Sequence, residues 1–195
     1  MDRADIIELN YITPIENISS ILQYGILSNK QASRIGHVSV AMEEIQERRK
    51  DKRIPGARSL HDYANLYFDA HNPMLSKRRE QNDSICILRI NPGVLDIPGV
   101  IISDRNAASD YARFYPVAEG IEALDKDLVF ARYWTHPDPY EAMRCKSIKC
   151  AEALVPDRVE PGHILGAYVV NETVLSTLQS LNVGLSAIIK HDIFF

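Results

Sequence analysis

The sequence predicts a single α+β domain over residues 1–195. Segments rich in β-branched and aromatic residues alternate irregularly with segments of helical periodicity, which amounts to roughly six or seven strands and about four helices. No strand–helix unit of about 30 residues recurs, so a doubly wound parallel sheet is not expected. The length is enough for one domain with a substantial core. We expect helices mainly early in the chain and strands mainly late.

The composition is that of an ordinary soluble protein, with 46% apolar and 25% charged residues. No apolar run approaches the ~20 residues of a membrane-spanning helix. The acidic start at residues 1–5 lacks the apolar stretch of a signal peptide. Three cysteines, an odd number without metal-ligand spacing, are typical of a reducing compartment. We therefore expect a cytoplasmic protein without membrane contact, and the singly scattered histidines predict no metal site.

The first elements are a strand at residues 6–12 and a helix that begins at Pro14. Thr13 is the expected N-cap, and Glu16 would complete a capping box. Gly25 is expected to end the helix. Residues 28–37 are polar and read as a loop.

A second helix is expected from about Val38 to Lys50, with an apolar stripe at Val38, Met42 and Ile45. The next position on that stripe is Arg49, so this cation should face the protein interior. Arg48 should lie on the surface. The alternative for Arg49 is that its side chain extends to water at the helix end.

The remaining elements are assigned from local pattern alone. Strands are expected at about 64–68, 84–90, 99–103, 163–170 and 187–190, and helices from about 107, over 117–134 with an interruption at Asp125, and over 172–181. Turns or loops are expected at 72–75 and 135–139.

A late apolar strand that ends at Pro156 carries a single acid, Glu152. A carboxylate is costly to bury unless it has partners or a chemical role. Glu152 is therefore the candidate catalytic acid, and an inward Arg49 is its candidate partner. A guanidinium binds pyrophosphate, and a carboxylate can stabilise positive charge on a sugar ring or accept a proton, as glycosyl transfer from NAD⁺ would require. The alternative is a purely structural ion pair.

The net charge is −4, which argues against a generally basic nucleic-acid-binding protein. Basic residues nevertheless cluster at 48–53, at 77–79 and at 144–149. Three solvated faces are the favoured interpretation, and one groove for a polyanion is the alternative.

Seven stretches in order resemble the DarT family of DNA ADP-ribosyltransferase toxins. They are YITPIENI at 11–18 with Gly25, IQERR at 45–49, LHDYANLYF at 60–68, PML at 73–75, SDRN at 103–106, ARF at 112–114 and CAEALV at 150–155. The resemblance implies an ADP-ribosyltransferase fold, with a split central β-structure and an NAD-binding cleft. It also implies a toxin that transfers ADP-ribose from NAD to a base of single-stranded DNA, releases nicotinamide and pairs with a DarG-type antitoxin.

The resemblance further assigns residues to roles. Glu152 and Arg49 would be catalytic, and NAD would contact Tyr11, Thr13, Gly25, Leu27, Tyr67 and Met74. Residues 133–149 would form the loop that recognises DNA, and the expected DNA contacts are Arg144, Lys146, Lys149, Tyr133, Trp134, Arg48 and Arg113.

Many members of the family carry His where this chain has Tyr11, and again near Tyr111. This departure favours guanine over thymine as the modified base. Three alternatives stay open: a transferase of the same fold that acts on RNA or protein, an inactive module that binds NAD or nucleic acid, and a structural domain in which Arg49 and Glu152 only pair.

Overall fold

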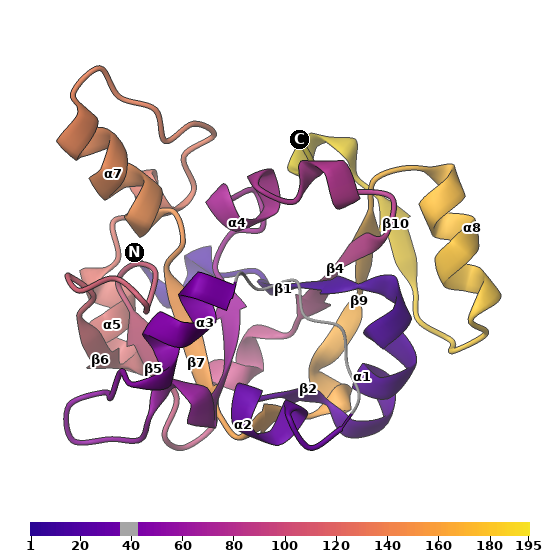
Figure 1. Ribbon diagram of the computed structural model, residues 1–195, viewed down its shortest axis with the longest axis horizontal. Coiled ribbons are helices and arrows are strands. Elements are labelled where there is room, and N and C mark those ends of the chain that lie inside the picture. The colour runs from indigo at the N-terminus through magenta and orange to yellow at the C-terminus, as the bar shows by residue number, and fades with distance from the viewer. Residues whose placement is uncertain (36–42) are drawn as a thin grey trace.

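We describe a computed structural model over residues 1–35 and 43–195, with the backbone alone for residues 43–46. The α+β class is confirmed: an eight-stranded, mostly antiparallel sheet in the order β10-β9-β4-β1-β3-β7-β5-β6 is accompanied by a two-stranded sheet, β2-β8 (Figure 1). The described strands are β1 (Leu9–Pro14), β2 (Ile26–Leu27), β3 (Tyr63–Tyr67), β4 (Ile85–Ile90), β5 (Ile101–Ser103), β6 (Phe114–Pro116), β7 (Glu152–Pro156), β8 (Arg158–Val159), β9 (Ile164–Val169) and β10 (Ala187–Ile189).

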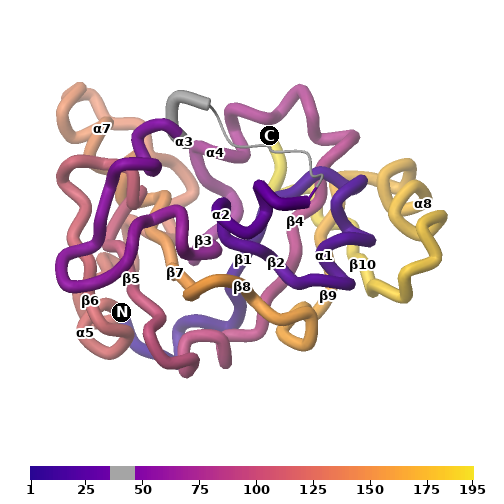
Figure 2. The backbone as a smooth tube through the Cα atoms, turned by 60° about the horizontal axis from the view of Figure 1, so that its bottom comes forward, coloured from indigo at the N-terminus to yellow at the C-terminus, as the bar shows by residue number. Residues whose placement is uncertain are grey.

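Helices surround the sheet, with α7 and α8 at opposite ends of the molecule in both views (Figures 1 and 2). The described α-helices are α1 (Ile18–Tyr24), α2 (Asn29–Ala32), α3 (Glu43–Lys50), α4 (Pro73–Ser76), α5 (Val117–Ala123), α6 (Lys126–Val129), α7 (Pro139–Ile148) and α8 (Glu172–Ser180). Strands and helices are interspersed along the whole chain, so the expected order of helices early and strands late is wrong.

The sheet is split between β1 and β3. Strand β1 pairs with β4 along its whole length, from Leu9↔Ile90 to Pro14↔Ile85. It pairs with β3 at the single position Asn10↔Tyr67. Beyond that position the two strands diverge, and β3 continues instead along β7. The fork between β1 and β3 is the split central β-structure that the family resemblance implies.

Gly25 ends helix α1, as predicted, and adopts φ +86°, which disfavours a side chain. A Cβ atom at this position would lie 2.3 Å from the carbonyl oxygen of Val159, so strand β8 passes too close for any other residue. The start of the helix differs from the prediction. Thr13 still belongs to β1, its hydroxyl donates to the carbonyl of Pro14, and a short 3-10 helix (Ile15–Asn17) precedes α1.

Other predicted segments also differ from the structure. The segment expected to begin a helix near Ala107 is a series of turns, followed by strand β6 at 114–116. The turn at 72–75 is helix α4, whose N-cap Asn72 accepts from the amides of Met74 and Leu75. The loop expected at 28–37 contains α2. The apolar stripe at Val38, Met42 and Ile45 lies outside the residues whose side chains are described.

The burial of Cys86 in the core can be tested by the pH dependence of the free energy of unfolding. Burial raises the pKa of its thiol from 9.0 to about 12, so the unfolded chain releases the proton first as pH rises. The unfolded state then binds fewer protons, and stability falls with pH. Relative to Cys86→Ala, the wild-type free energy of unfolding should fall by about 1.4 kcal/mol between pH 8 and pH 10 in urea titrations. An equal pH dependence of both proteins would contradict this burial.

Candidate active site

A cavity of about 530 Å³ opens in the fork between β1 and β3. Its walls come from β1, β3, the end of α3, the segment 106–111 and helix α7. This volume lies within the range of about 300–1,000 Å³ that is typical of small-molecule sites.

Arg49 and Glu152 meet at the wall of this cavity. The Nη1 atom of Arg49 donates to Glu152 Oε2 at 3.0 Å and to Oε1 at 3.2 Å, across 103 residues of sequence. Both residues are buried: the exposed fraction is 6% for Arg49 and 1% for Glu152. The inward orientation predicted for Arg49 is therefore confirmed, and Arg48 is exposed as predicted. Arg49 lines the cavity and Glu152 does not. The Arg49 guanidinium therefore lies between the carboxylate and the cavity.

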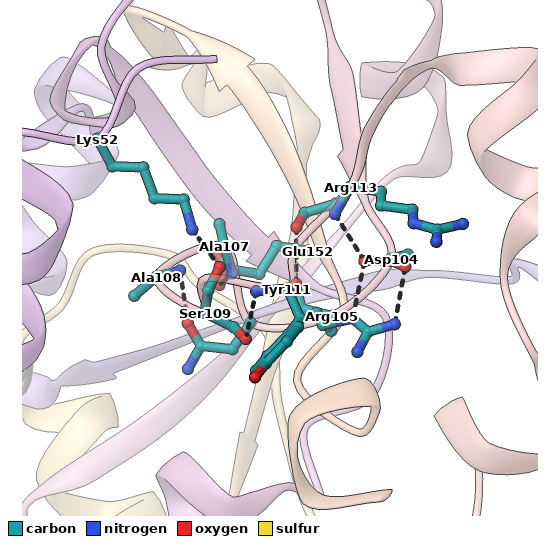
Figure 3. Close-up of polar contacts among 11 residues, drawn as sticks. Lys52, Asp104, Arg105, Ala107, Ala108, Ser109, Tyr111, Arg113 and Glu152 are labelled. Carbon is teal, nitrogen blue, oxygen red and sulfur yellow. Dashed lines mark hydrogen bonds and ion pairs between the residues drawn. The ribbon is translucent and has the colours of Figure 1, made fainter. Parts of the chain in front are cut away.

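A second donor to Glu152 comes from the turn segment that follows β5. The backbone amide of Ala107 donates to Glu152 Oε1 at 3.0 Å (Figure 3). The position of the carboxylate in strand β7 is set by the sheet, where Glu152 lies opposite Tyr67 of β3 and Ser103 of β5. Three hydrogen bonds and a countercharge thus satisfy an acid that would otherwise be costly to bury.

All six residues that the family resemblance assigned to NAD line this one cavity. They are Tyr11, Thr13, Gly25, Leu27, Tyr67 and Met74. Burial raises the pKa of Tyr11 to about 12, and burial together with the charge of Glu152 raises that of Tyr67 well above its usual value. Both phenols therefore remain hydrogen-bond donors at neutral pH.

Cys150 also lines the cavity, two residues before Glu152. Burial raises the pKa of its thiol to about 12, and the negative charge of Glu152 acts in the same direction. A thiol in this state is a poor nucleophile at neutral pH. Cys150 is therefore not a candidate nucleophile of the site.

Each of the three basic clusters contributes at least one residue to the cavity lining. Its lining includes Arg48 and Arg49 from the first cluster, Lys77 and Arg78 from the second, and Lys146 from the third. The alternative of a single groove for a polyanion thus describes these five residues better than three separate solvated faces.

Lys149 is a correction to the predicted DNA contacts. Its side chain is fully buried; the ammonium forms an ion pair with Asp69 and donates to the carbonyl of Val129 at 2.9 Å. Lys146 lies within α7 and is exposed, whereas Lys149 is the C-cap residue where the chain leaves the helix and turns into the interior. Lys149 therefore cannot contact DNA phosphates in this structure.

The segment 133–149 is also different from the expected loop. Residues from Pro139 to Ile148 form helix α7, and Asp138 caps it by accepting from the amides of Tyr140 and Glu141. Arg144 lies on this helix and forms an exposed pair with Glu141 at 3.1 Å. Tyr133 and Tyr140 are 76% and 77% exposed, so both rings remain accessible for stacking.

Trp134 and Arg113 do not reach the cavity lining. The ring of Trp134 packs against Phe195, with the centroids 5.7 Å apart, and against His71 at 6.0 Å. It is therefore part of an aromatic cluster of the protein rather than an exposed stacking platform. Arg113 is exposed, and its side chain points away from the segment that holds Glu152 (Figure 3).

The segment 106–111 lines the cavity with Asn106, Ala108, Ser109, Asp110 and Tyr111, although the sequence analysis placed no site residue there. Two signals pointed to it, the SDRN stretch that ends at Asn106 and the departure from the family pattern near Tyr111, but a helix was expected from about Ala107. Sequence reasoning also missed Ser147, which lines the cavity and has a buried hydroxyl without a hydrogen-bond partner among the described residues. A buried polar atom of this kind is uncommon and is consistent with a ligand or a water molecule.

Within the described residues, no group of three or more His, Cys, Asp or Glu side chains is arranged to hold a metal ion. Among these residues no helix is both long and apolar enough to span a bilayer. All three cysteines are free.

We compared the chain with known protein families and solved structures. The sequence model described as "DarT: ssDNA thymidine ADP-ribosyltransferase" matches residues 10–195. A DNA ADP-ribosyl transferase–DNA ADP-ribosyl glycohydrolase fusion protein of Thermosipho africanus is 34% identical over 180 residues, which are 88% of this chain and 45% of the relative. The chain thus spans about half the length of that fusion protein.

Solved structures show the same fold. Thermosipho africanus DarTG in complex with ADP-ribose superimposes with a TM-score of 0.84 at 31% identity, over 96% of this chain and 51% of the other. Thermus sp. 2.9 DarT in complex with ADP-ribosylated ssDNA gives 0.83 at 24% identity, over 98% and 97%. The same Thermus protein in complex with NAD⁺ gives 0.78 at 23%, over 98% of each chain. The fold is that of the DarT ADP-ribosyltransferases.

Proposed function

Because the chain belongs to the DarT family, we propose that it is an enzyme that transfers ADP-ribose from NAD⁺ to a base of single-stranded DNA and releases nicotinamide. The observation that carries the proposal is the buried Arg49–Glu152 pair at the wall of a cavity of about 530 Å³. NAD⁺ is also the ligand of the Thermus relative, whose fold this chain shares.

The cavity suits a dinucleotide in size and in chemistry. NAD⁺ supplies the ADP-ribosyl group and nicotinamide as leaving group. We assign its binding to Tyr11, Thr13, Gly25, Leu27, Tyr67 and Met74. The buried hydroxyl of Ser147 is a further candidate donor. The phenols of Tyr11 and Tyr67 keep their protons at neutral pH and can donate to ribose or phosphate oxygens.

Arg49 and Glu152 have complementary parts in the reaction. The Arg49 guanidinium faces the cavity and can bind a phosphate or a ribose hydroxyl. Movement of Arg49 toward the substrate would open the Glu152 carboxylate to the reacting centre, and catalytic contacts often form only in the substrate complex. The bond from the ribose anomeric carbon to nicotinamide breaks, a bond to the DNA base forms, and the base proton passes to Glu152.

The DNA strand is proposed to lie along the basic rim. Arg48, Lys146 and Arg144 provide charge for the phosphates, and Arg113 extends this surface on the other side of the segment 106–111. Tyr133 is exposed and can stack on a base. A single strand is the expected substrate because pairing and stacking hide the reactive atoms of a base.

Two bases are candidates for the modification. The sequence favours guanine because Tyr11 replaces a histidine that is common in the family, whereas the description of the family model names thymidine. Mass spectrometry of oligonucleotides in which a single guanine or a single thymine is the one acceptor distinguishes them.

A toxin role in the cytoplasm follows from the proposed chemistry, since modified DNA bases obstruct replication. The antidote would be a DarG-type antitoxin. The Thermosipho africanus relative joins a transferase to a DNA ADP-ribosyl glycohydrolase, and this chain matches 45% of its length.

Incubation with labelled NAD⁺ and separate pools of single-stranded DNA, duplex DNA, RNA and protein tests the proposal. The expected result is label on single-stranded DNA together with release of nicotinamide. Label on RNA alone or on protein alone would show that the acceptor is that molecule and not single-stranded DNA. NAD⁺ binding without nicotinamide release in any pool would indicate an inactive binding module.

A further inference from the structure

Lys52 lies two residues beyond helix α3 and reaches the segment that contacts Glu152 (Figure 3). Its ammonium donates to the backbone carbonyl of Ser109 and lies 5.9 Å from the ring centroid of Phe114. Its own backbone is tied to Arg49, whose carbonyl accepts from the Lys52 amide at 3.3 Å, and to Leu60, whose amide donates to the Lys52 carbonyl at 3.0 Å. Lys52 thus connects the C-terminal end of α3, which carries Arg49, with the segment around Ser109.

The segment it reaches, 106–111, holds the other side of the Glu152 carboxylate. The amide of Ala107, two residues before Ser109, donates to Glu152 Oε1 at 3.0 Å. The segment is fixed at its start by Asn106, whose amide donates to the carbonyl of Ser147 at 2.9 Å. At the other side, the amide of Arg113 donates to Asp104 at 3.0 Å. Turn hydrogen bonds also form within the segment, for example from the Ser109 amide to the Asn106 carbonyl at 2.9 Å. The bond from Lys52 connects its middle to the chain that follows α3.

The charge of Lys52 also acts on the site. Burial lowers the pKa of the ammonium, and the nearby Asp110 and Glu152 carboxylates act in the opposite direction. The positive charge of Arg49 also lowers the pKa of Lys52.

We propose that Lys52 is a positioning residue for ADP-ribosyl transfer: it ties the segment 106–111 to the end of α3, so that Arg49 and the Ala107 amide hold the Glu152 carboxylate from two sides. The inference rests on the proposed function. Lys52 is not among the described residues that line the cavity, so its effect on the substrate is indirect. Displacement of a catalytic group by about 1 Å can lower a rate by ~10²-fold.

Lys52→Met keeps the length of the side chain and removes the donor and the charge. Lys52→Arg keeps both, and Lys50→Met is the matched control, because Lys50 ends the same helix with a mostly exposed side chain paired to Glu47 at 3.8 Å. We expect Lys52→Met to lower kcat by about 10- to 100-fold with KM for NAD⁺ within about twofold. Lys52→Arg should restore kcat to within about threefold of wild type, and Lys50→Met should match wild type.

Hydrogen exchange gives a measurement that does not require activity. Amides 106–109 should exchange at least about tenfold faster in Lys52→Met than in wild type or Lys50→Met, because an amide released from its partner is no longer protected. If Lys52→Met does not fold, Lys52→Leu, which also lacks the donor and the charge, takes its place in both measurements. Unchanged kcat with unchanged exchange would overturn the inference. A wild-type protein without transferase activity would instead overturn the proposed function, and the exchange comparison would still decide whether Lys52 holds the segment.

Discussion

Glu152→Gln is expected to lower ADP-ribosyl transfer by about 10²–10⁴-fold, the usual contribution of a general base, while NAD⁺ binding is retained. Glutamine keeps the shape of the carboxylate and one acceptor oxygen, which at the Oε1 position can still accept from Ala107 N and from Arg49 Nη1. The bond from Arg49 Nη1 to Oε2 is lost, because the amide nitrogen is a donor. Glutamine cannot accept a proton or balance positive charge on the ribose. Single-turnover transfer to an oligonucleotide and NAD⁺ titration measure the two quantities separately.

The same substitution also affects stability, because Glu152 is the countercharge of a buried cation. Removal of one partner from a buried ion pair costs about 3–5 kcal/mol. A domain of ordinary stability, about 5–15 kcal/mol, remains mostly folded after such a loss. Destabilisation alone therefore does not separate a catalytic pair from a structural one, and activity measured on the folded protein does.

Glu160→Gln is the matched control for this experiment. Glu160 is an exposed acid that pairs with Arg158 at 2.7 Å and is not among the described residues that line the cavity. The Glu160→Gln variant should transfer ADP-ribose at the wild-type rate, and its free energy of unfolding should stay within about 0.5 kcal/mol of the wild-type value. A folded Glu152→Gln protein with wild-type transfer would contradict the catalytic assignment and leave a structural ion pair as the explanation.

Lys149→Met is expected to destabilise the protein by about 3 kcal/mol. The substitution removes the countercharge of Asp69 and the donor to the carbonyl of Val129. The expected loss lies at the lower end for buried ion pairs because the Asp69 side chain is 23% exposed and its charge stays partly hydrated. Denaturant unfolding, compared at equal slope, measures the change.

Lys146→Met provides a control on the same helix with the opposite expected outcome. Lys146 is exposed and lines the cavity rim, so its loss should change stability by no more than about 0.5 kcal/mol. It should weaken binding of single-stranded DNA and reduce the salt dependence of that binding by about 0.7 in logarithmic slope. If Lys149→Met were stable and selectively defective in DNA binding, our correction of its assignment would be wrong.

The double variant Asp69→Asn/Lys149→Met tests the cause of the Lys149 effect. Asparagine keeps the oxygen that accepts from the amide of His71 at 2.9 Å. It leaves no unpaired charge, and replacing both members of a buried pair is often close to neutral. We therefore expect the double variant to recover much of the lost stability.

Much of the local structure could be predicted from residue type and spacing. The polarity of Glu152 within an apolar strand, the stop at Pro156 and the glycine at position 25 are each visible within a few residues, and the structure agrees with all three. The helical stripe likewise indicated that Arg49 faces inward. The cap of α7 by Asp138 was missed, although an Asp followed by Pro is a known helix start.

The tertiary structure alone decided which of these residues act together. Arg49 meets Glu152 across 103 residues, Lys149 meets Asp69 across 80, and Lys52 meets Ser109 across 57. Periodicity reports the face of an element on which a side chain lies, but the partner on that face depends on how the sheet pairs and where it splits. By itself the sequence determined a candidate acid, a candidate cation and three basic clusters. The fork between β1 and β3 made one cavity of them, because pairing at the single position Asn10↔Tyr67 leaves the two strands free to diverge.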